Sequence, residues 1–404
     1  MKIFKLMLVA LVATLGFTAC DNEPEHIYDD HSADIVGTWS CLTENYAEVI
    51  IINADGSAVS YGVEDGEYWE NVRGTVTVKE NKITMIFEDD DNFTGHFDII
   101  PGQAFSHFED TGERYIYQYC ANDLADEVVG MWVCNDAKDN MRIQTFEENG
   151  NTVFSGWSEH LGEFSVLDNA NHKVVGDLIF QGFSNAQKPS SKYIAAKLIY
   201  APNGTAHGDI MTFKHYLFDG IESAESWLRI KQSLDLANNS YDYSNIYVTN
   251  VKAKDEEFEF AGQTLNLATM DGRILDKMMK TLLFNVSFPS SEQIIYNYHY
   301  NGENVPIPSP IVVEGNKMTI KKSVSNPIFK DIDVWTFQDK DNTQMHMYMH
   351  VSSFENFLAN TAVEMMVNEG KLDLNNTEKV AEIYAAVADA IETINVSFIF
   401  KTAK

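Results

Sequence analysis

The stretch IVGTWSC at residues 35–41 recurs as VVGMWVC at residues 128–134, a shift of 93 positions (35 to 128). In both copies an apolar run follows and ends in a turn dipeptide, Asp55-Gly56 in the first and Asn149-Gly150 in the second. Such dipeptides between apolar runs are strong hairpin signals, because both central positions of a type I′ turn need a positive φ. The two matching units predict a duplicated small β barrel rather than a solenoid repeat.

Short runs of β-branched and aromatic residues fill the sequence between these marks. Many short strands at even spacing predict an up-and-down antiparallel barrel or a sandwich. The less regular stretch 221–236 is expected to form a short helix. The predicted strands cover residues 74–78, 82–87, 93–99 and 115–119 in the first copy, and 153–157, 163–167, 173–181, 193–200 and 210–217 in the second.

A third unit begins near Val248 and lacks the Gly-x-Trp motif. Apolar residues at helical spacing predict a helix over 271–283 and two late helices over 354–368 and 377–394, followed by a last strand over 395–400. Strand-like runs lie between the first of these helices and the other two. We therefore expect a third β-barrel-like domain that carries C-terminal helices.

The motifs Gly37-Thr38-Trp39 and Gly130-Met131-Trp132 resemble the Gly-x-Trp signature of lipocalins and calycins. The duplicated unit is similar to the lipocalin-like and calycin-like domains of lipoproteins from Gram-negative gut bacteria, over residues 34 to about 220. This resemblance implies a mainly β fold of tandem lipocalin-like antiparallel β-barrels. It also implies that Trp39 and Trp132 each close one end of a barrel, with Gly37 and Gly130 in the same structural signature.

The start of the chain indicates export. Lys2 and Lys5 precede an apolar run that, at about a dozen residues, is shorter than the roughly 20 a spanning helix needs. The sequence FTAC at residues 17–20 resembles a bacterial lipobox, in which the cysteine becomes the acylated first residue, so we expect lipidation at Cys20. Ordinary secretion with a chance cysteine is the alternative.

These features give five predicted segments. They are a lipoprotein signal peptide at 1–19, a lipidated flexible tether at 20–33, a first lipocalin-like β-barrel at 34–122, a second at 123–245 and a calycin-like β domain with helices at 246–404. We expect the mature protein at the cell envelope, anchored by lipid to a membrane, in either the periplasmic or the surface-exposed leaflet of the outer membrane.

Charge and cysteine content limit the possible partners. The formal net charge of −31 argues against nucleic acid as a partner. Cys41, Cys120 and Cys134 remain after Cys20, and an odd count leaves the disulfide pairing open. We expect no cofactor and no metal site.

The segment QMHMYMH at residues 344–350 suggests a metal site built from Met and His. In a strand, however, successive side chains point to opposite faces, so the methionines and the histidines lie on different faces. Met345, Met347 and Met349 share one strand face, which predicts a core stripe or the wall of an apolar ligand cavity. The acidic runs at 88–91 and 339–342 are expected to be solvated hairpin tips. No catalytic motif stands out, so we name no catalytic residue and expect a protein that is not an enzyme.

Aromatic residues suggest a binding surface. Tyr61, Tyr68, Trp69 and Trp157 fall at predicted strand ends, where they form either a stacking platform or part of the barrel cores. The leading functional hypothesis is a non-enzymatic binding protein that holds a small apolar molecule in a barrel. The alternative is a structural or adhesive surface lipoprotein that recognises a protein or glycan through loops. An apolar cavity of roughly 300 Å³ would favour the first, and filled cores the second.

Replacing the predicted acylation site tests the export hypothesis. We expect Cys20→Ala to abolish incorporation of labelled palmitate and to release the protein from the membrane fraction, because the lipid on Cys20 is the predicted anchor. Cys41→Ala is the matched control and should leave both properties unchanged. Membrane retention of Cys20→Ala at the wild-type level would contradict the lipoprotein hypothesis.

Overall fold

The computed structural model describes residues 32–79, 82–88, 92–108, 114–134, 142–158, 163–185, 188–202, 209–216, 222–254, 257–260, 263–266, 268, 272–300, 303–323 and 327–402. The predicted signal peptide, Cys20 and most of the predicted tether lie outside these residues. Within the described ranges no helix has both the length and the apolar character to cross a membrane.

Barrel 1 is a closed sheet of eight antiparallel strands in chain order. It closes because β1 (Gly37–Leu42) pairs with β8 (Arg114–Tyr119) as well as with β2 (Tyr46–Ile52). Successive side chains of a strand point to opposite faces, so Ile50 of β2 lies in the barrel core whereas Val49 faces barrel 2. The remaining strands are β3 (Ser57–Glu64), β4 (Glu67–Lys79), β5 (Lys82–Phe87), β6 (Asn92–Ile100) and β7 (Ala104–Phe108).

Barrel 2 repeats this topology. Its strand β9 (Gly130–Cys134) pairs with both β10 (Arg142–Phe146) and β16 (Glu222–Ile230), which closes a second eight-stranded barrel. The short helix α2 (Ala125–Val128) precedes it. The other strands are β11 (Asn151–Ser158), β12 (Glu163–Val175), β13 (Leu178–Asn185), β14 (Lys188–Ala201) and β15 (Ile210–Tyr216).

Barrel 3 is also closed, through the pairing of β17 (Asn239–Ala253) with β26 (Ile391–Lys401). Between these strands it contains β20 (Leu283–Ser290), β21 (Gln293–Tyr300), β22 (Glu303–Glu314), β23 (Lys317–Ile320), β24 (Ile332–Gln338) and β25 (Gln344–Met349). The hairpin of β18 (Glu257–Phe260) and β19 (Gln263–Asn266) and the helix α3 (Gly272–Leu282) follow β17. Helices α4 (Val351–Asn368) and α5 (Thr377–Ala390) pack on the barrel core through Phe354, Leu358, Val363 and Val380.

The predicted fold class is confirmed, since the chain forms three closed antiparallel barrels with helices near its end. The expected short helix at 221–236 is wrong, because β16 pairs with β15 and β9 there. The strand β17 spans the predicted boundary between residues 245 and 246 and pairs with β26 along most of its length.

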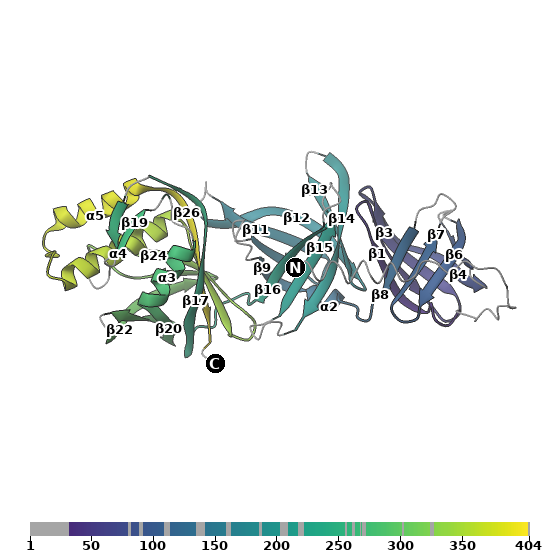
Figure 1. Cartoon of the computed structure of the whole chain (residues 1–404), viewed down its shortest axis with the longest axis horizontal. Coiled ribbons are helices and arrows are strands. Elements are labelled where there is room, and N and C mark those ends of the chain that lie inside the picture. The colour runs from purple at the N-terminus through teal and green to yellow at the C-terminus, as the bar shows by residue number, and fades with distance from the viewer. Residues whose placement is uncertain are drawn as a thin grey trace, which may run out of the picture.

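The three barrels lie in a row, with barrel 2 in the middle and helices α4 and α5 at the far end of barrel 3 (Figure 1). At the junction of barrels 1 and 2, Val49 lies in one apolar cluster with Leu178 and Phe180 of β13. The backbone N–H of Tyr193 donates to the carbonyl of Gly66 across this junction at 3.1 Å. Apolar packing and backbone hydrogen bonds therefore hold the first two barrels together.

Barrels 2 and 3 meet through aromatic packing. Phe164 of β12 contacts three rings of barrel 3, with centroid separations of 5.2 Å to Trp335, 5.6 Å to Phe337 and 5.3 Å to Tyr348. All four residues belong to one apolar cluster that also contains Val133 and other residues of barrel 2. This cluster is core-like, so the two barrels form a continuous packed body.

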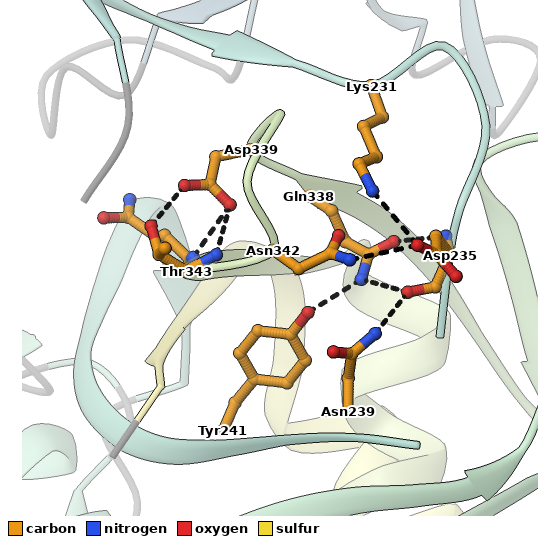
Figure 2. Close-up of polar contacts among 9 residues, drawn as sticks. Lys231, Asp235, Asn239, Tyr241, Gln338, Asp339, Asn342 and Thr343 are labelled. Atoms are coloured by element: carbon orange, nitrogen blue, oxygen red, sulfur yellow. Dashed lines mark hydrogen bonds and ion pairs between the residues drawn. The ribbon is translucent and has the colours of Figure 1, made fainter. Parts of the chain in front are cut away.

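The segment that links barrels 2 and 3 is fixed by polar contacts (Figure 2). The Gln338 side chain donates to the Asp235 carbonyl at 2.9 Å and to the Tyr241 hydroxyl at 2.8 Å, and accepts from the Asp235 N–H at 2.5 Å. Asn342 and Lys231 donate to the Asp235 carboxylate at 3.0 and 3.2 Å. The linker is thereby bound to the β24–β25 hairpin.

Two buried carboxylates lie at the same junction, and that of Asp209 connects the two barrels. Asp209 of barrel 2 accepts from the Lys340 ammonium at 2.5 Å and from the Tyr200 hydroxyl at 2.7 Å. Asp339 accepts from the backbone N–H of Thr343 at 2.6 Å and is fully buried. The expectation that 339–342 is a solvated hairpin tip is therefore wrong for Asp339, because the neighbouring barrel covers this turn.

Truncating an aromatic ring at this junction tests the coupling of the two barrels. Phe337→Ala should cost about 3–5 kcal/mol of interface packing, so calorimetric unfolding of barrels 2 and 3 should separate into two transitions. Phe105→Ala, the same change inside barrel 1, is the matched control and should leave barrels 2 and 3 unfolding together. A single shared transition in Phe337→Ala would show that this cluster does not couple them.

Candidate functional site

One end of barrels 1 and 2 is occupied by a tryptophan with a duplicated hydrogen bond. Trp39 and Trp132 are fully buried. The indole N–H of Trp39 donates to the carbonyl of Ile35 at 2.7 Å, and that of Trp132 donates to the carbonyl of Val128 at 2.7 Å. We call this end of each barrel the tryptophan end, and the strand ends remote from it the mouth.

The glycines of the motif have backbones that other residues rarely adopt. Gly37 has φ +139° and Gly130 has φ +133°. A Cβ at Gly37 would lie 2.7 Å from the ring of Tyr119, which itself packs edge-on against Trp39 at 5.1 Å. The small residue therefore allows the strand to start close to the ring that covers the tryptophan.

The mouth of barrel 1 contains a buried carboxylate. Glu48 lies opposite Cys41, on the β2 face that carries Ile50 into the core, and is 5% exposed. Its Oε1 accepts from the Ser60 hydroxyl at 2.6 Å. Its Oε2 accepts from the Tyr46 hydroxyl at 2.5 Å and from the Tyr117 hydroxyl.

The groups that donate to Glu48 remain protonated. Burial, followed by the charge of Glu48, raises the pKa of Tyr46 and of Tyr117 well above the usual phenol range. Burial and then Glu48 also raise the pKa of the Cys41 thiol to about 12. Neutral hydroxyls therefore solvate this carboxylate in place of water.

Aromatic rings surround the carboxylate at the mouth. Tyr46, Trp69, Phe93 and Tyr115 are half-buried and lie near the strand ends remote from Trp39. The Tyr46 ring lies 5.1 Å from Tyr115 and 6.0 Å from Trp69, between centroids. These rings and Glu48 form the candidate site, which we call the aromatic mouth.

Trp69 is hydrogen-bonded to the polar network around Glu48. Its indole N–H donates to the Ser60 hydroxyl at 2.9 Å, and Ser60 in turn donates to Glu48. A Cβ at Gly62 would lie 2.2 Å from the Trp69 ring, so the ring occupies space that only glycine leaves open. Gly62 of β3 therefore leaves room for this ring beside Ser60, the residue that links it to Glu48.

His107 completes the aromatic mouth. It is 5% exposed and stacks near Tyr115 at 5.2 Å and Phe93 at 4.2 Å. Its Nδ1 has no hydrogen-bond partner in the part of the chain that the structure describes. Burial lowers the pKa of His107 to about 4, so the ring is neutral at pH 7.

The equivalent position in barrel 2 has the opposite charge. There Arg142 lies opposite Cys134, as Glu48 lies opposite Cys41. Arg142 forms an ion pair with Glu225 at 2.9 Å, and its guanidinium lies 5.6 Å from the Trp227 ring centroid. The duplicated barrels therefore differ in the polar groups of their interiors.

The methionine stripe lies in the core of barrel 3. Met345, Met347 and Met349 are at most 3% exposed and pack in one cluster with Phe354 of α4. On the opposite strand face, Tyr348 joins the junction with barrel 2. The three methionines therefore line a packed core, and a ligand-facing role for them stays a prediction.

The other residues named from the sequence lie in several parts of the structure. Tyr61 and Tyr68 pack at the junction of barrels 1 and 2, Trp69 belongs to the aromatic mouth, and the Trp157 side chain is outside the described residues. Cys41, Cys120 and Cys134 are buried thiols, and none of the three is in a disulfide with another described residue. Of the acidic run at 88–91, residues 89–91 lie outside the described residues. Among described residues no cluster of three His, Cys, Asp or Glu is placed to hold a metal ion.

A separate hollow of about 540 Å³ lies beside the junction of barrels 1 and 2. Its aromatic members Tyr68 and Tyr193 stack on each other at 4.4 Å, and its Lys173 pairs with Glu70 at 3.6 Å. Its lining also contains the carboxylates of Asp126, Glu147 and Glu148, so the hollow is acidic.

The site residue Glu48 was missed from the sequence. It stands in the run YAEVIII at residues 46–52, where it shares the phase of Tyr46, Ile50 and Ile52. A charged residue in phase with core residues of a strand is the signal that identifies it.

No family model and no curated protein sequence matches the chain. Solved structures that align with it include a double mutant of transferrin-binding protein B from Haemophilus parasuis Hp5, with TM-score 0.25, 9% identity and coverage of 90% of this chain and 67% of that one. Isotype 1 transferrin-binding protein B from serogroup B Neisseria meningitidis aligns with TM-score 0.21 and 9% identity, over 89% of this chain and 66% of that one. This chain thus spans about two thirds of those proteins, and likeness at this level assigns neither family nor function.

Buried histidines should make stability depend on pH. Burial lowers the pKa of His346 from 6.5 to about 3, so between these values the unfolded chain binds a proton that the folded chain does not. The free energy of unfolding therefore falls as pH drops from 6.5 toward 3, by up to about 1.4 kcal/mol per pH unit for one proton.

We expect His346→Gln to reduce this slope in urea denaturation measured at several pH values. His299→Gln, at an exposed position, is the matched control. An unchanged slope in His346→Gln would show that His346 is not a neutral buried group.

Proposed function

We propose that the chain is a lipid-anchored, non-enzymatic binding protein of the cell envelope that meets its ligand at a barrel mouth. In this proposal the ligand is not an apolar molecule enclosed in a barrel. The carrying observation is that large side chains fill the barrel interiors while half-buried aromatic rings surround the mouth of barrel 1.

The filled interiors argue for recognition from outside. An eight-stranded barrel is just wide enough for its own side chains or for one small ligand. Here the largest fully buried side chains include Trp39, Phe105 and Tyr117 in barrel 1, Trp132, Phe146 and Trp227 in barrel 2, and Phe288 and Phe354 in barrel 3. These cores support the hypothesis of a surface protein that recognises a protein or glycan through its strand ends and loops.

The direction of the chain also supports this site. Ile35, at the tryptophan end, receives the Trp39 hydrogen bond, so the segment from the predicted anchor reaches barrel 1 at the end opposite the aromatic mouth. A mouth that points away from the anchored end is accessible to a partner outside the membrane. The two packed junctions would hold the mouth in a fixed orientation relative to the other barrels.

Native mass spectrometry of the protein purified from its own membranes tests the proposal against the carrier hypothesis. We expect the mass of the acylated polypeptide with no further apolar molecule, because large side chains are buried in the described part of each barrel interior. The same preparation, denatured and extracted with organic solvent, controls for ligands lost in the spectrometer. A stoichiometric apolar species in either preparation would restore the carrier hypothesis.

A further inference from the structure

We propose that the aromatic mouth of barrel 1 binds an organic cation, an alkylammonium or guanidinium group on a slender apolar stem. The inference rests on the proposed function, because it names the chemistry of a ligand that approaches this mouth. The group comes either from a free amine or from a lysine or arginine side chain of a partner protein.

The first step is the buried carboxylate. Glu48 is 5% exposed, accepts a hydrogen bond from the half-buried Tyr46, and shares the Ser60 hydroxyl with the indole of the half-buried Trp69. Attraction between opposite charges is stronger in such a poorly hydrated site than in water. The hydroxyls of Tyr46, Ser60 and Tyr117 donate to Glu48 and orient its carboxylate.

The second step is the aromatic wall. A cation is attracted to the face of Trp or Tyr when it lies within about 6 Å of the ring centroid. Tyr46 stands between Tyr115 and Trp69, with centroid separations of 5.1 and 6.0 Å, so one small cation can approach more than one of these rings. All three rings are half-buried, so they remain partly accessible from outside.

The third step is His107. Its Nδ1 is unpartnered among the described residues, although the side chain is 95% buried and stacked beside Tyr115. A neutral imidazole nitrogen can accept a hydrogen bond from an ammonium or guanidinium N–H. It also adds no positive charge that would repel a cationic ligand.

The duplicated barrel supplies an internal comparison. In barrel 2 the protein's own guanidinium, that of Arg142, lies between the carboxylate of Glu225 and the ring of Trp227. Trp227 of barrel 2 corresponds to Tyr117 of barrel 1. In the pairing of β16 with β9, Trp227 lies opposite Cys134. In the pairing of β8 with β1, Tyr119 lies opposite Trp39, and Tyr117 lies two residues before Tyr119, at the level of Cys41. Barrel 2 thus holds a built-in cation at the level where barrel 1 has a carboxylate and aromatic rings.

The test uses the full-length protein in detergent and measures ligand binding by saturation-transfer NMR titration. The probes are n-butylammonium, n-butylguanidinium and the uncharged isostere n-butanol, together with a capped Gly-Lys-Gly peptide. We expect both cations to bind saturably and about tenfold more tightly than n-butanol. Binding of the peptide as well as the amine would identify a lysine side chain of a partner as the source, and binding of the amine alone a free small molecule.

Variants locate the binding. Glu48→Gln keeps the shape of the side chain and should weaken cation binding about tenfold, with little effect on n-butanol. Trp69→Leu should weaken cation binding about threefold, because it removes one ring. Glu67→Gln, at an exposed position of the same barrel, is the matched control for the general acidity of the protein and should change affinity less than about twofold.

Circular dichroism and thermal unfolding check that each variant folds. If Glu48→Gln does not fold, the effect of Trp69→Leu on cation binding decides the outcome. Equal affinity for n-butylammonium and n-butanol would overturn the inference while leaving a ligand site at the mouth. Equal weakening by Glu67→Gln and Glu48→Gln, or no saturable cation binding, would overturn it as well. An apolar molecule retained in a barrel would instead count against the proposed function.

Discussion

Closure of each sheet is the constraint on which the rest of this structure depends. When β1 pairs with β8, β9 with β16 and β17 with β26, every second side chain of eight strands must point into one narrow interior. Large aromatic and methionine side chains fill that space, so the interior stabilises the barrel. Under the proposed function, the ends and outer faces of the barrels are then the surfaces that recognise a ligand.

Duplication kept the parts that close the barrel and changed the parts that line it. Both copies retain the tryptophan, its hydrogen bond to a carbonyl four residues earlier and the glycine of positive φ. The residue opposite the buried cysteine is Glu48 in one and Arg142 in the other. Stability therefore depends on the shared tryptophan end, whereas the mouth carries the chemistry that distinguishes the two copies.

The sequence was sufficient for the barrels and for the positions of the late helices because these follow from local periodicity, although the predicted end of the last helix at residue 394 is wrong and lies within β26. The Gly-x-Trp repeat, the turn dipeptides and the alternation of strands each act within a few residues. The β16 strand was misjudged as a helix because its pairing partners, β9 and β15, are defined only by tertiary structure.

Long-range packing explains why the burial of Asp339 and the role of Glu48 could not be predicted from the sequence. Asp339 has the sequence context of an exposed turn, and only the neighbouring barrel makes it buried. The role of Glu48 depends on Tyr117 and Ser60, residues 69 and 12 positions away in the chain. No pattern within a single strand reveals such a network, although the charge in phase with Ile50 and Ile52 marks its position.

Diffraction from crystals pressurised with xenon examines the filled interiors most directly, because xenon enters empty apolar cavities in proteins. Packed barrels should show no xenon within the clusters around Trp39, Trp132 or Met347. An ordered xenon atom inside any of the three would reveal a cavity and contradict the central claim that these barrels are solid and meet their ligands from outside.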